Sequence, residues 1–217
     1  MPPSLHQIIH FFNFIGSLVC HQRPERTLII GGQHLPVCAR CTGGYLGFLV
    51  GYVVLLFRRK DAKGPPSLWM TMMLSTPMII DVFMQVLYIR ESTNSWRLLT
   101  GLFFGVATLP FLVYVLQLVP ITRRLPVFSH VSPKSPQIDD FWDPWISSKA
   151  LFLGALICLL VFFVMIYSPA VSSPLLYWII TPPLVFSIIL HIFLLPPLLL
   201  VSVVYEFLSS RISPSKP

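Results

Sequence analysis

The sequence predicts an all-α fold, a polytopic bundle of helices that crosses a membrane several times. Of its 217 residues, 55% are hydrophobic and only 11% are charged, whereas about a quarter of the residues in soluble domains are charged. The mean hydropathy is +0.77. The apolar residues also come in runs close to or above the roughly 18–20 residues that a helix needs to cross a hydrocarbon core. These observations together predict an integral membrane protein.

About five transmembrane helices are expected, preceded by a short N-terminal helix that is amphipathic or membrane-inserted. The expected spans are 42–57, 67–89, 96–119, 149–167 and 175–207. The last exceeds the length of one straight span and contains two Pro-Pro pairs. We therefore expect it to be broken, strongly tilted or extended along the interface.

These spans divide the chain into three parts. Residues 1–119 hold the N-terminal helix, a Cys/His loop and the first three spans, which together carry the polar site. Residues 120–148 form a connector rich in proline and serine, and residues 149–217 hold the last two spans.

The N-terminal helix is expected over residues 5–19. Its polar residues recur at helical spacing: His6, His10, Asn13 and Ser17. The opposite face is apolar, which predicts a helix that lies in the interface or packs against the bundle. The polar stripe either faces water and headgroups or helps to line a site around Cys20. The first twenty residues lack a basic n-region, so we expect no cleavable signal peptide.

The distribution of basic residues predicts the orientation. Loops on one side of the membrane carry ten basic residues: Arg58, Arg59, Lys60, Lys63, Arg123, Arg124, Lys134, Lys149, Arg211 and Lys216. Loops on the other side carry five: Arg23, Arg26, Arg40, Arg90 and Arg97. The positive-inside rule places the larger set in the cytoplasm. The Cys/His loop is then extracytoplasmic and the C-terminus cytoplasmic.

The net charge of +7 is explained by this topology, because the basic residues sit at the ends of apolar runs. The chain offers no basic and aromatic platform of soluble length, so we expect no nucleic-acid partner. The expected partner is the lipid bilayer.

Thiols, imidazoles and guanidinium groups are concentrated in one stretch, VCHQRPERTLIIGGQHLPVCARCTGGY, residues 19–45. Cys38 and Cys41 form a C-x-x-C, and Cys20 precedes it by 18 residues, a separation typical of the two halves of a structural zinc site. Three cysteines and one histidine would complete a tetrahedral shell for a zinc or iron ion. The predicted ligands are Cys20, His21, Cys38 and Cys41. His34 and His10 compete with His21, because adjacent side chains diverge.

The same cysteines admit two other interpretations. An extracytoplasmic compartment favours disulfides, and membrane thiol oxidoreductases display their redox pair as a C-x-x-C. One alternative is therefore a quinone-coupled thiol–disulfide oxidoreductase, with Cys38 and Cys41 as the pair and Cys20 as the exchange partner. The other is a non-catalytic accessory subunit, whose stapled loop would dock onto a partner membrane protein. Cys158 lies in an apolar span and is expected to be a packing residue.

Asp81 and Gln85 place a carboxylate and an amide inside an apolar run. Asp81 lies nine residues before Arg90, which at 1.5 Å per residue puts it about 13 Å below the surface. Ionisable residues at such depth are functional by default. The alternative is a structural bond to a neighbouring helix.

The turn RESTNSWR, residues 90–97, either caps the helix that follows or forms an anion site through its two arginines. We predict four catalytic residues: Asp81, Arg90, Asn94 and Arg97. Arg23 and Arg26 are predicted to bind an anionic or lipid-linked small molecule.

Glycines at four-residue spacing predict which helices meet. They are Gly43, Gly47 and Gly51 in one span and Gly101 and Gly105 in another. Such small-xxx-small faces allow close helix contact in membranes. We expect the helix after the cysteines to pack on the helix after the RESTNSWR turn, so that one site is assembled from distant segments.

Four of these motifs also carry a resemblance. CHQRPERT, LPVCARCTGGYLG, DVFMQ and RESTNSWRLLTGLFFG occur in this order within residues 15–108. In them the sequence resembles a family of predicted membrane proteins from archaea and bacteria known as domain of unknown function 2085. The resemblance implies a membrane protein with a shared polar site and implies no particular reaction. An enzyme and a non-catalytic subunit both fit the sequence. A transporter fits less well, since no second intramembrane acid follows Asp81 until Glu206.

Overall fold

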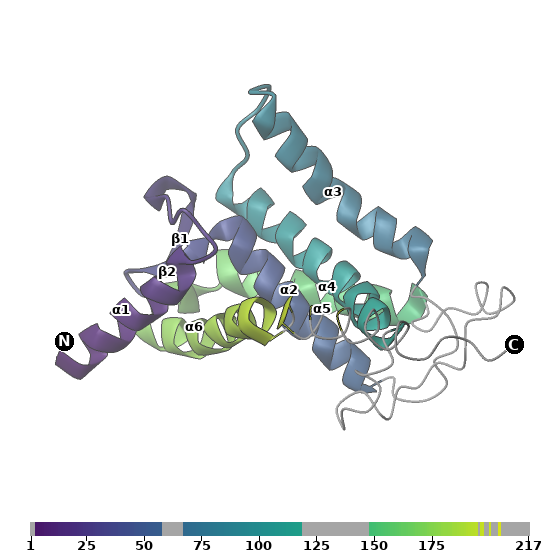
Figure 1. Cartoon of the computed structure of the whole chain (residues 1–217). Coiled ribbons are helices and arrows are strands. Elements are labelled where there is room, and N and C mark those ends of the chain that lie inside the picture. The colour runs from purple at the N-terminus through teal and green to yellow at the C-terminus, as the bar shows by residue number, and fades with distance from the viewer. Residues whose placement is uncertain are drawn as a thin grey trace, which may run out of the picture.

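A computed structural model describes residues 3–57, 67–118 and 148–194, together with positions 196, 197, 200 and 204. Within these residues the chain forms six α-helices and one two-stranded sheet (Figure 1). The predicted all-α membrane bundle is thus confirmed. The predicted connector, 120–148, lies outside the described residues except for Ser148, which begins a helix. Most of the chain after Leu194 also lies outside them, as do the basic residues expected in both stretches.

Among the described residues, four helices are long and apolar enough to cross a membrane. These stretches are Leu68–Val86, Asn94–Leu112, Lys149–Tyr167 and Pro174–Phe193. They belong to α3 (Leu68–Val86), α4 (Asn94–Leu118), α5 (Ser148–Tyr167) and α6 (Pro174–Ile189) with the π-helical turn after it (Leu190–Leu194). The fifth expected span is α2 (Ala39–Phe57), which is apolar but shorter over Ala39–Leu55.

The longest expected span changes its helical type near its end. Pro182 and Pro183 lie inside α6 without ending it. The regular helix gives way to the π-helical turn at Leu190, which widens the hydrogen-bond ladder locally. The described part of this span is therefore a continuous helix over residues 174–194 that changes its type at Leu190 and is not broken at its first Pro-Pro pair.

The Cys/His loop folds as a β-hairpin. Strand β1 (Thr27–Ile30) pairs antiparallel with β2 (Gln33–Cys38), and Ile30 lies opposite Gln33. Gly31 and Gly32 form the turn with φ of +58° and +75°, a left-handed conformation that glycine adopts without strain. Strand β2 runs directly into α2, so the C-x-x-C sits at a strand–helix junction.

The N-terminal helix α1 (Pro3–Ser17) packs on this hairpin and on α6. Ile15 is buried, and Phe12 lies against Trp178 with 6.2 Å between ring centroids. His6 and His10 are exposed, with their rings 4.4 Å apart. The amphipathic prediction holds for the packed face, but Phe11 and Phe14 are also exposed on the outer face.

The backbones of α2 and α4 touch at the predicted glycine faces. A methyl group on Gly47 would lie 2.4 Å from the Leu102 carbonyl oxygen, and one on Gly101 would lie 2.4 Å from the Arg40 carbonyl oxygen. Only glycine permits such an approach. The start of α2, which carries the C-x-x-C, is thereby held against the start of α4.

The core is centred on α4, α5 and α6, and α3 stands at its edge (Figure 1). Leu98, Leu102 and Leu151 are fully buried, and so is Cys158, whose thiol lies 3.6 Å from the Leu102 carbonyl oxygen. Cys158 therefore packs as expected. In contrast, α3 buries only four residues: Met70, Leu74, Ser75 and Asp81.

Candidate metal centre and arginine cavities

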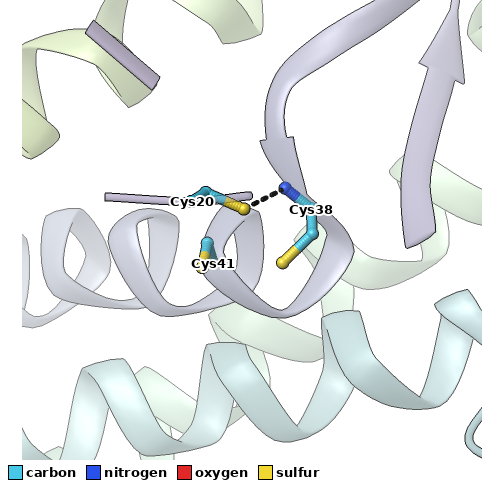
Figure 2. Close-up of side chains that lie close together, drawn as sticks. All are labelled: Cys20, Cys38 and Cys41. Atoms are coloured by element: carbon cyan, nitrogen blue, oxygen red, sulfur yellow. Dashed lines mark hydrogen bonds between the residues drawn. The ribbon is translucent and has the colours of Figure 1, made fainter. Parts of the chain in front are cut away.

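Three elements bring three cysteines together. Cys20 follows α1, Cys38 ends β2 and Cys41 lies in the first turn of α2. Their sulfur atoms all lie within 4.8 Å of one another, and each side chain is half-buried (Figure 2). Ligand atoms around tetrahedral zinc are about 3.8 Å apart at a Zn–S distance of about 2.3 Å. The sulfurs are therefore close to metal-binding geometry.

Hydrogen bonds favour a thiolate at Cys20. Its sulfur accepts a bond from the Cys38 backbone N–H at 3.3 Å, as Figure 2 shows. The Cys38 thiol, then the Cys41 thiol, lower the pKa of Cys20 well below its usual value of 9.0 by donating to its thiolate, while burial opposes them. A thiolate is the form that binds metals and attacks disulfides.

Gln22 fixes the position of the first cysteine. Its side-chain amide donates to the Asn13 carbonyl at 2.6 Å and to the Pro36 carbonyl at 2.8 Å. Its φ of 49° is unusual for a residue with a side chain. Gln22 thus joins the end of α1 to β2 and holds Cys20 against the C-x-x-C.

The sulfurs face a cavity of about 330 Å³, which we call the cysteine cavity. It is lined by Val19, Cys20, His21, Gln22, Arg23, Arg26, Cys38 and Cys41. The His21 ring is exposed and lies outside the sulfur group, although it lines the same cavity. Among the described residues no histidine joins the three sulfurs, so His34 and His10, also exposed, are not placed there either.

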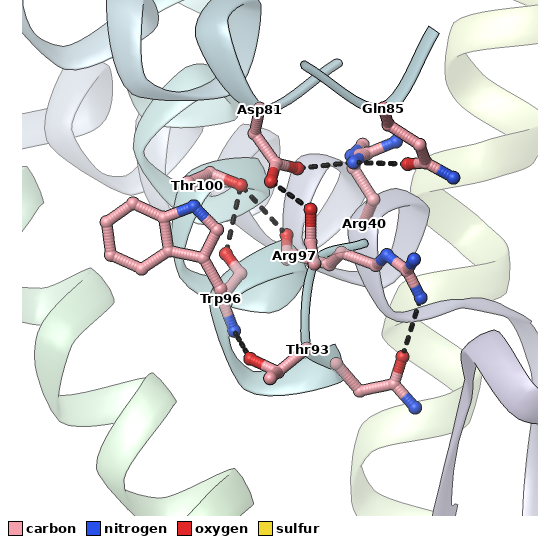
Figure 3. Close-up of polar contacts among 9 residues, drawn as sticks. Arg40, Asp81, Gln85, Thr93, Trp96, Arg97 and Thr100 are labelled. Atoms are coloured by element: carbon pink, nitrogen blue, oxygen red, sulfur yellow. Dashed lines mark hydrogen bonds and ion pairs between the residues drawn. The ribbon is translucent and has the colours of Figure 1, made fainter. Parts of the chain in front are cut away.

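Arg40, between the two cysteines of the C-x-x-C, binds Asp81. One guanidinium nitrogen donates to the Asp81 carboxylate and, at 3.0 Å, to Gln85 (Figure 3). The Ser92 hydroxyl donates to the other carboxylate oxygen. The Asp81 side chain is only 4% exposed. Asp81 therefore links α3, the start of α2 and the turn before α4.

Asp81 also lies nearer to the helix end than the sequence predicted. Helix α3 ends at Val86 and not at residue 89, and the chain reverses at Tyr88 with a φ of 57°. Asp81 is thus about 7.5 Å from the end of the helix along its axis. This position lets Ser92 reach its carboxylate.

Arg97 and its neighbours form a second polar cavity of about 320 Å³, the arginine cavity. It is lined by Arg23, Glu25, Arg26, Glu91, Ser92, Thr93, Asn94 and Arg97. Arg97 is 5% exposed and donates to the Asn94 side-chain oxygen at 3.2 Å (Figure 3). Asn94 in turn donates to the Glu25 carbonyl at 3.1 Å, which holds this turn against the segment after Cys20.

The turn also caps α4, as one alternative predicted. The Trp96 backbone N–H donates to the Thr93 hydroxyl oxygen at 3.3 Å (Figure 3). Arg90 differs from its predicted companions: it is exposed and lines a separate cavity of about 500 Å³ with Arg40, Gln85 and Glu91. Arg23 and Arg26 line all three polar cavities.

Two of these residues were not predicted from the sequence. They are Arg40, which pairs with Asp81, and Gln22, which holds Cys20 against the C-x-x-C. A signal existed for the first, since a buried carboxylate requires a cation or several hydrogen-bond donors. No sequence signal marks Gln22, because its role depends on a backbone conformation.

This fold and this site define a class: a polytopic α-helical membrane protein with a three-cysteine group of metal-ligand spacing beside arginine-lined cavities. The family model described as "Predicted membrane protein (DUF2085)" matches residues 20–111, and the chain belongs to this family. The matched segment begins at Cys20 and contains the three cysteines, Arg40, Asp81 and Arg97. The family that the sequence motifs indicated is thereby confirmed.

Two archaeal relatives support this assignment. The chain is 38% identical over 109 residues to an uncharacterized protein of Methanocaldococcus jannaschii, a match covering 46% of this chain and 70% of that protein. It is 39% identical over 88 residues to an uncharacterized protein of Methanothermobacter thermautotrophicus, covering 41% of this chain and 78% of that protein. No solved structure shows significant similarity to the chain.

Proposed function

We propose that this membrane protein holds a zinc or iron ion on Cys20, Cys38 and Cys41 and uses it to bind an anionic small molecule. The observation that carries the proposal is the meeting of three sulfurs within 4.8 Å, although Cys20 and Cys38 are 18 residues apart in sequence. Three thiolates and one divalent ion carry a net charge of −1. Arg23 and Arg26, which line the cysteine cavity, offset that charge.

The fourth coordination position is proposed to face the cysteine cavity. Structural zinc sites have four protein ligands, whereas catalytic sites have three and keep one position for water or substrate. The described residues supply three sulfurs, and His21 lines the cavity from outside the group. A metal bound there would supply Lewis-acid chemistry to a ligand in the cavity.

A second candidate function is thiol–disulfide exchange with a quinone as electron acceptor. The lowered pKa of Cys20 favours it, because a thiolate is the attacking species in exchange. In this candidate the Cys38–Cys41 pair would be oxidised and the quinone reduced, and no metal would be held.

We further propose that the site is extracytoplasmic. The support is the ten-to-five distribution of basic residues between the two sets of loops. The segment between Cys20 and the hairpin contacts the RESTNSWR turn through Glu25 and Asn94, so we place both on the same side.

Elemental analysis with thiol counting on detergent-purified protein tests the metal proposal. Wild-type protein is compared with Cys38→Ser and with Cys158→Ser, a matched control because Cys158 is buried in the core. We expect about one zinc or iron ion per chain in the wild type and in Cys158→Ser, and almost none in Cys38→Ser. A metal-free wild type with a Cys38–Cys41 disulfide that a quinone regenerates would replace this proposal with the second candidate.

A further inference from the structure

Arg97 is a buried cation without a carboxylate partner. The ion pairs within the described residues join Arg26 to Glu91 at 4.0 Å and Arg40 to Asp81. Arg97 is 5% exposed, and its Nε is buried without a hydrogen-bond partner in the described structure. A buried charge is unfavourable unless it is paired and hydrogen-bonded. Among the described residues, Arg97 therefore has no carboxylate at ion-pair distance.

The carboxylates near Arg97 form no ion pair with it among the described residues: Asp81, whose charge acts on Arg97, binds Arg40 and Ser92 instead. Glu91 lies at the cavity wall, but its side chain is 89% exposed and its contact with Arg26 is long. Glu25 is also exposed. Arg23 and Arg26 add positive charge to the same wall, and the N-terminus of α4, at Asn94, adds its partial positive charge. The field in this cavity favours an anion with several oxygen acceptors.

An apolar groove adjoins the arginine cavity between α3 and α4. Its volume is about 770 Å³, and its apolar walls include Trp69, Met72, Ile80 and Met84, while Asp81 and Arg90 line its polar end. Ser92 lines both the groove and the arginine cavity. A molecule with an apolar chain and an anionic head group would fit both, with its chain in the groove and its head group in the arginine cavity.

We propose that Arg97, with Arg26 and Asn94, binds the phosphate group of a ligand, and that a membrane lipid carries this phosphate with its chain in the apolar groove. Guanidinium groups bind phosphate by paired hydrogen bonds, which suits the free Nε of Arg97. This inference goes beyond the proposed function, because its phosphate site lies in the arginine cavity and is distinct from the sulfur ligands.

Thermal unfolding of the metal-loaded full chain in detergent measures this binding. The probes are dihexanoyl phosphatidic acid, inorganic phosphate and, as the anion control, chloride at equal ionic strength. The proteins are wild type, Arg97→Gln, Arg26→Gln and the control Lys149→Gln, an exposed basic residue that lines none of the four cavities described here. A ligand that binds only the folded state raises the unfolding midpoint with its concentration.

We expect phosphatidic acid to raise the midpoint of wild type and Lys149→Gln equally, and its apparent affinity to fall at least tenfold in Arg97→Gln. Stabilisation by phosphatidic acid alone assigns the phosphate to a lipid. Equal stabilisation by inorganic phosphate supports the phosphate site but overturns its assignment to a lipid. Wild-type affinity in Arg97→Gln, or the same effect with chloride, overturns the whole inference.

Two further measurements keep the test decisive. If Arg97→Gln does not fold, Arg26→Gln replaces it, and unchanged affinity in that variant counts against the inference. The metal content of each sample and a titration of chelator-treated wild type separate the two proposals. Phosphate binding without metal would leave the inference standing while the metal proposal fails.

Discussion

Arg40 links the two halves of the site, the cysteine group and the polar residues around Asp81. It lies between Cys38 and Cys41, yet its guanidinium group pairs with Asp81 on α3. Any shift of Asp81 would therefore move the backbone that carries both cysteines. The carboxylate that sequence reasoning treated as catalytic has this structural role in the fold.

Removing the Asp81 charge is expected to destabilise the protein. Asp81→Asn leaves Arg40 without its carboxylate in a mostly buried position, which typically costs about 3–5 kcal/mol of unfolding free energy. The double variant Asp81→Asn/Arg40→Gln should recover part of this loss, because it removes both partners. Denaturant unfolding in detergent measures both. Additive losses in the double variant would contradict the pairing.

The lowered pKa of Cys20 predicts how its reactivity depends on pH. A group with a lowered pKa keeps its charged form as pH falls, so Cys20 in reduced, metal-free protein remains a thiolate near pH 6. Its alkylation rate should be nearly constant between about pH 6 and 8, while free cysteine slows about tenfold per unit below its pKa. Mass spectrometry of iodoacetamide-treated protein follows Cys20. A tenfold decline per unit at this residue would refute the prediction.

At the scale of helices and strands, the contact of α2 with α4 positions the cysteines of the site. A methyl group on Gly101 would meet the Arg40 carbonyl oxygen, whereas Gly44 has open space around it. Gly101→Ala should lower the unfolding free energy by about 1–3 kcal/mol through overpacking and reduce the bound metal. Gly44→Ala should be neutral or slightly stabilising. The two variants are compared by unfolding and elemental analysis, and equal effects would show that the glycine contact does not position the cysteines.

The long elements could be predicted from the sequence because their signals are local. Runs of apolar residues define α3, α4 and α5, and the glycine spacing identifies the α2–α4 contact. The hairpin was not predicted, although Gly31-Gly32 between two short apolar runs is a hairpin signal. Pro36 within the second run weakened that signal, since proline removes a backbone donor from a strand.

The site could be predicted only in part. The C-x-x-C and Cys20 are visible as a spaced set of soft ligands. The pairing of Arg40 with Asp81 joins residues 41 positions apart, and no periodicity relates them. The placement of His21 depends on its side-chain conformation, which a sequence does not encode locally.

For the whole molecule, polar chemistry gathers at one end of an apolar bundle. The segment before the hairpin, the start of α2, the RESTNSWR turn and the last turns of α3 meet there through Asn94, Arg40 and Ser92. Apolar side chains such as Trp69 and Phe83 are exposed on α3, as expected of a lipid-facing surface. Among the described residues, the polar site therefore lies at one end of the apolar helices.

This arrangement predicts which residues a membrane-impermeant maleimide reaches in intact cells. Glu91→Cys should be labelled without lysis, because Glu91 is exposed beside the proposed extracytoplasmic site. Lys149→Cys, which belongs to the proposed cytoplasmic set, should be labelled only after permeabilisation. The reverse pattern would place the cysteine cluster in the cytoplasm.

X-ray absorption at the metal edge of the purified, metal-loaded protein tests the central claim most directly. The account predicts three sulfur ligands at about 2.3 Å and one lighter ligand at about 2.0 Å. In Cys20→Ser, as in Cys38→Ser, it predicts that most of the metal is lost and that any ion retained has only two sulfur ligands. His21→Ala should leave the sulfur shell unchanged and show whether the lighter ligand is its ring or an exchangeable molecule. A spectrum without sulfur ligands, or one unchanged in Cys20→Ser, would contradict a metal centre built on these three cysteines.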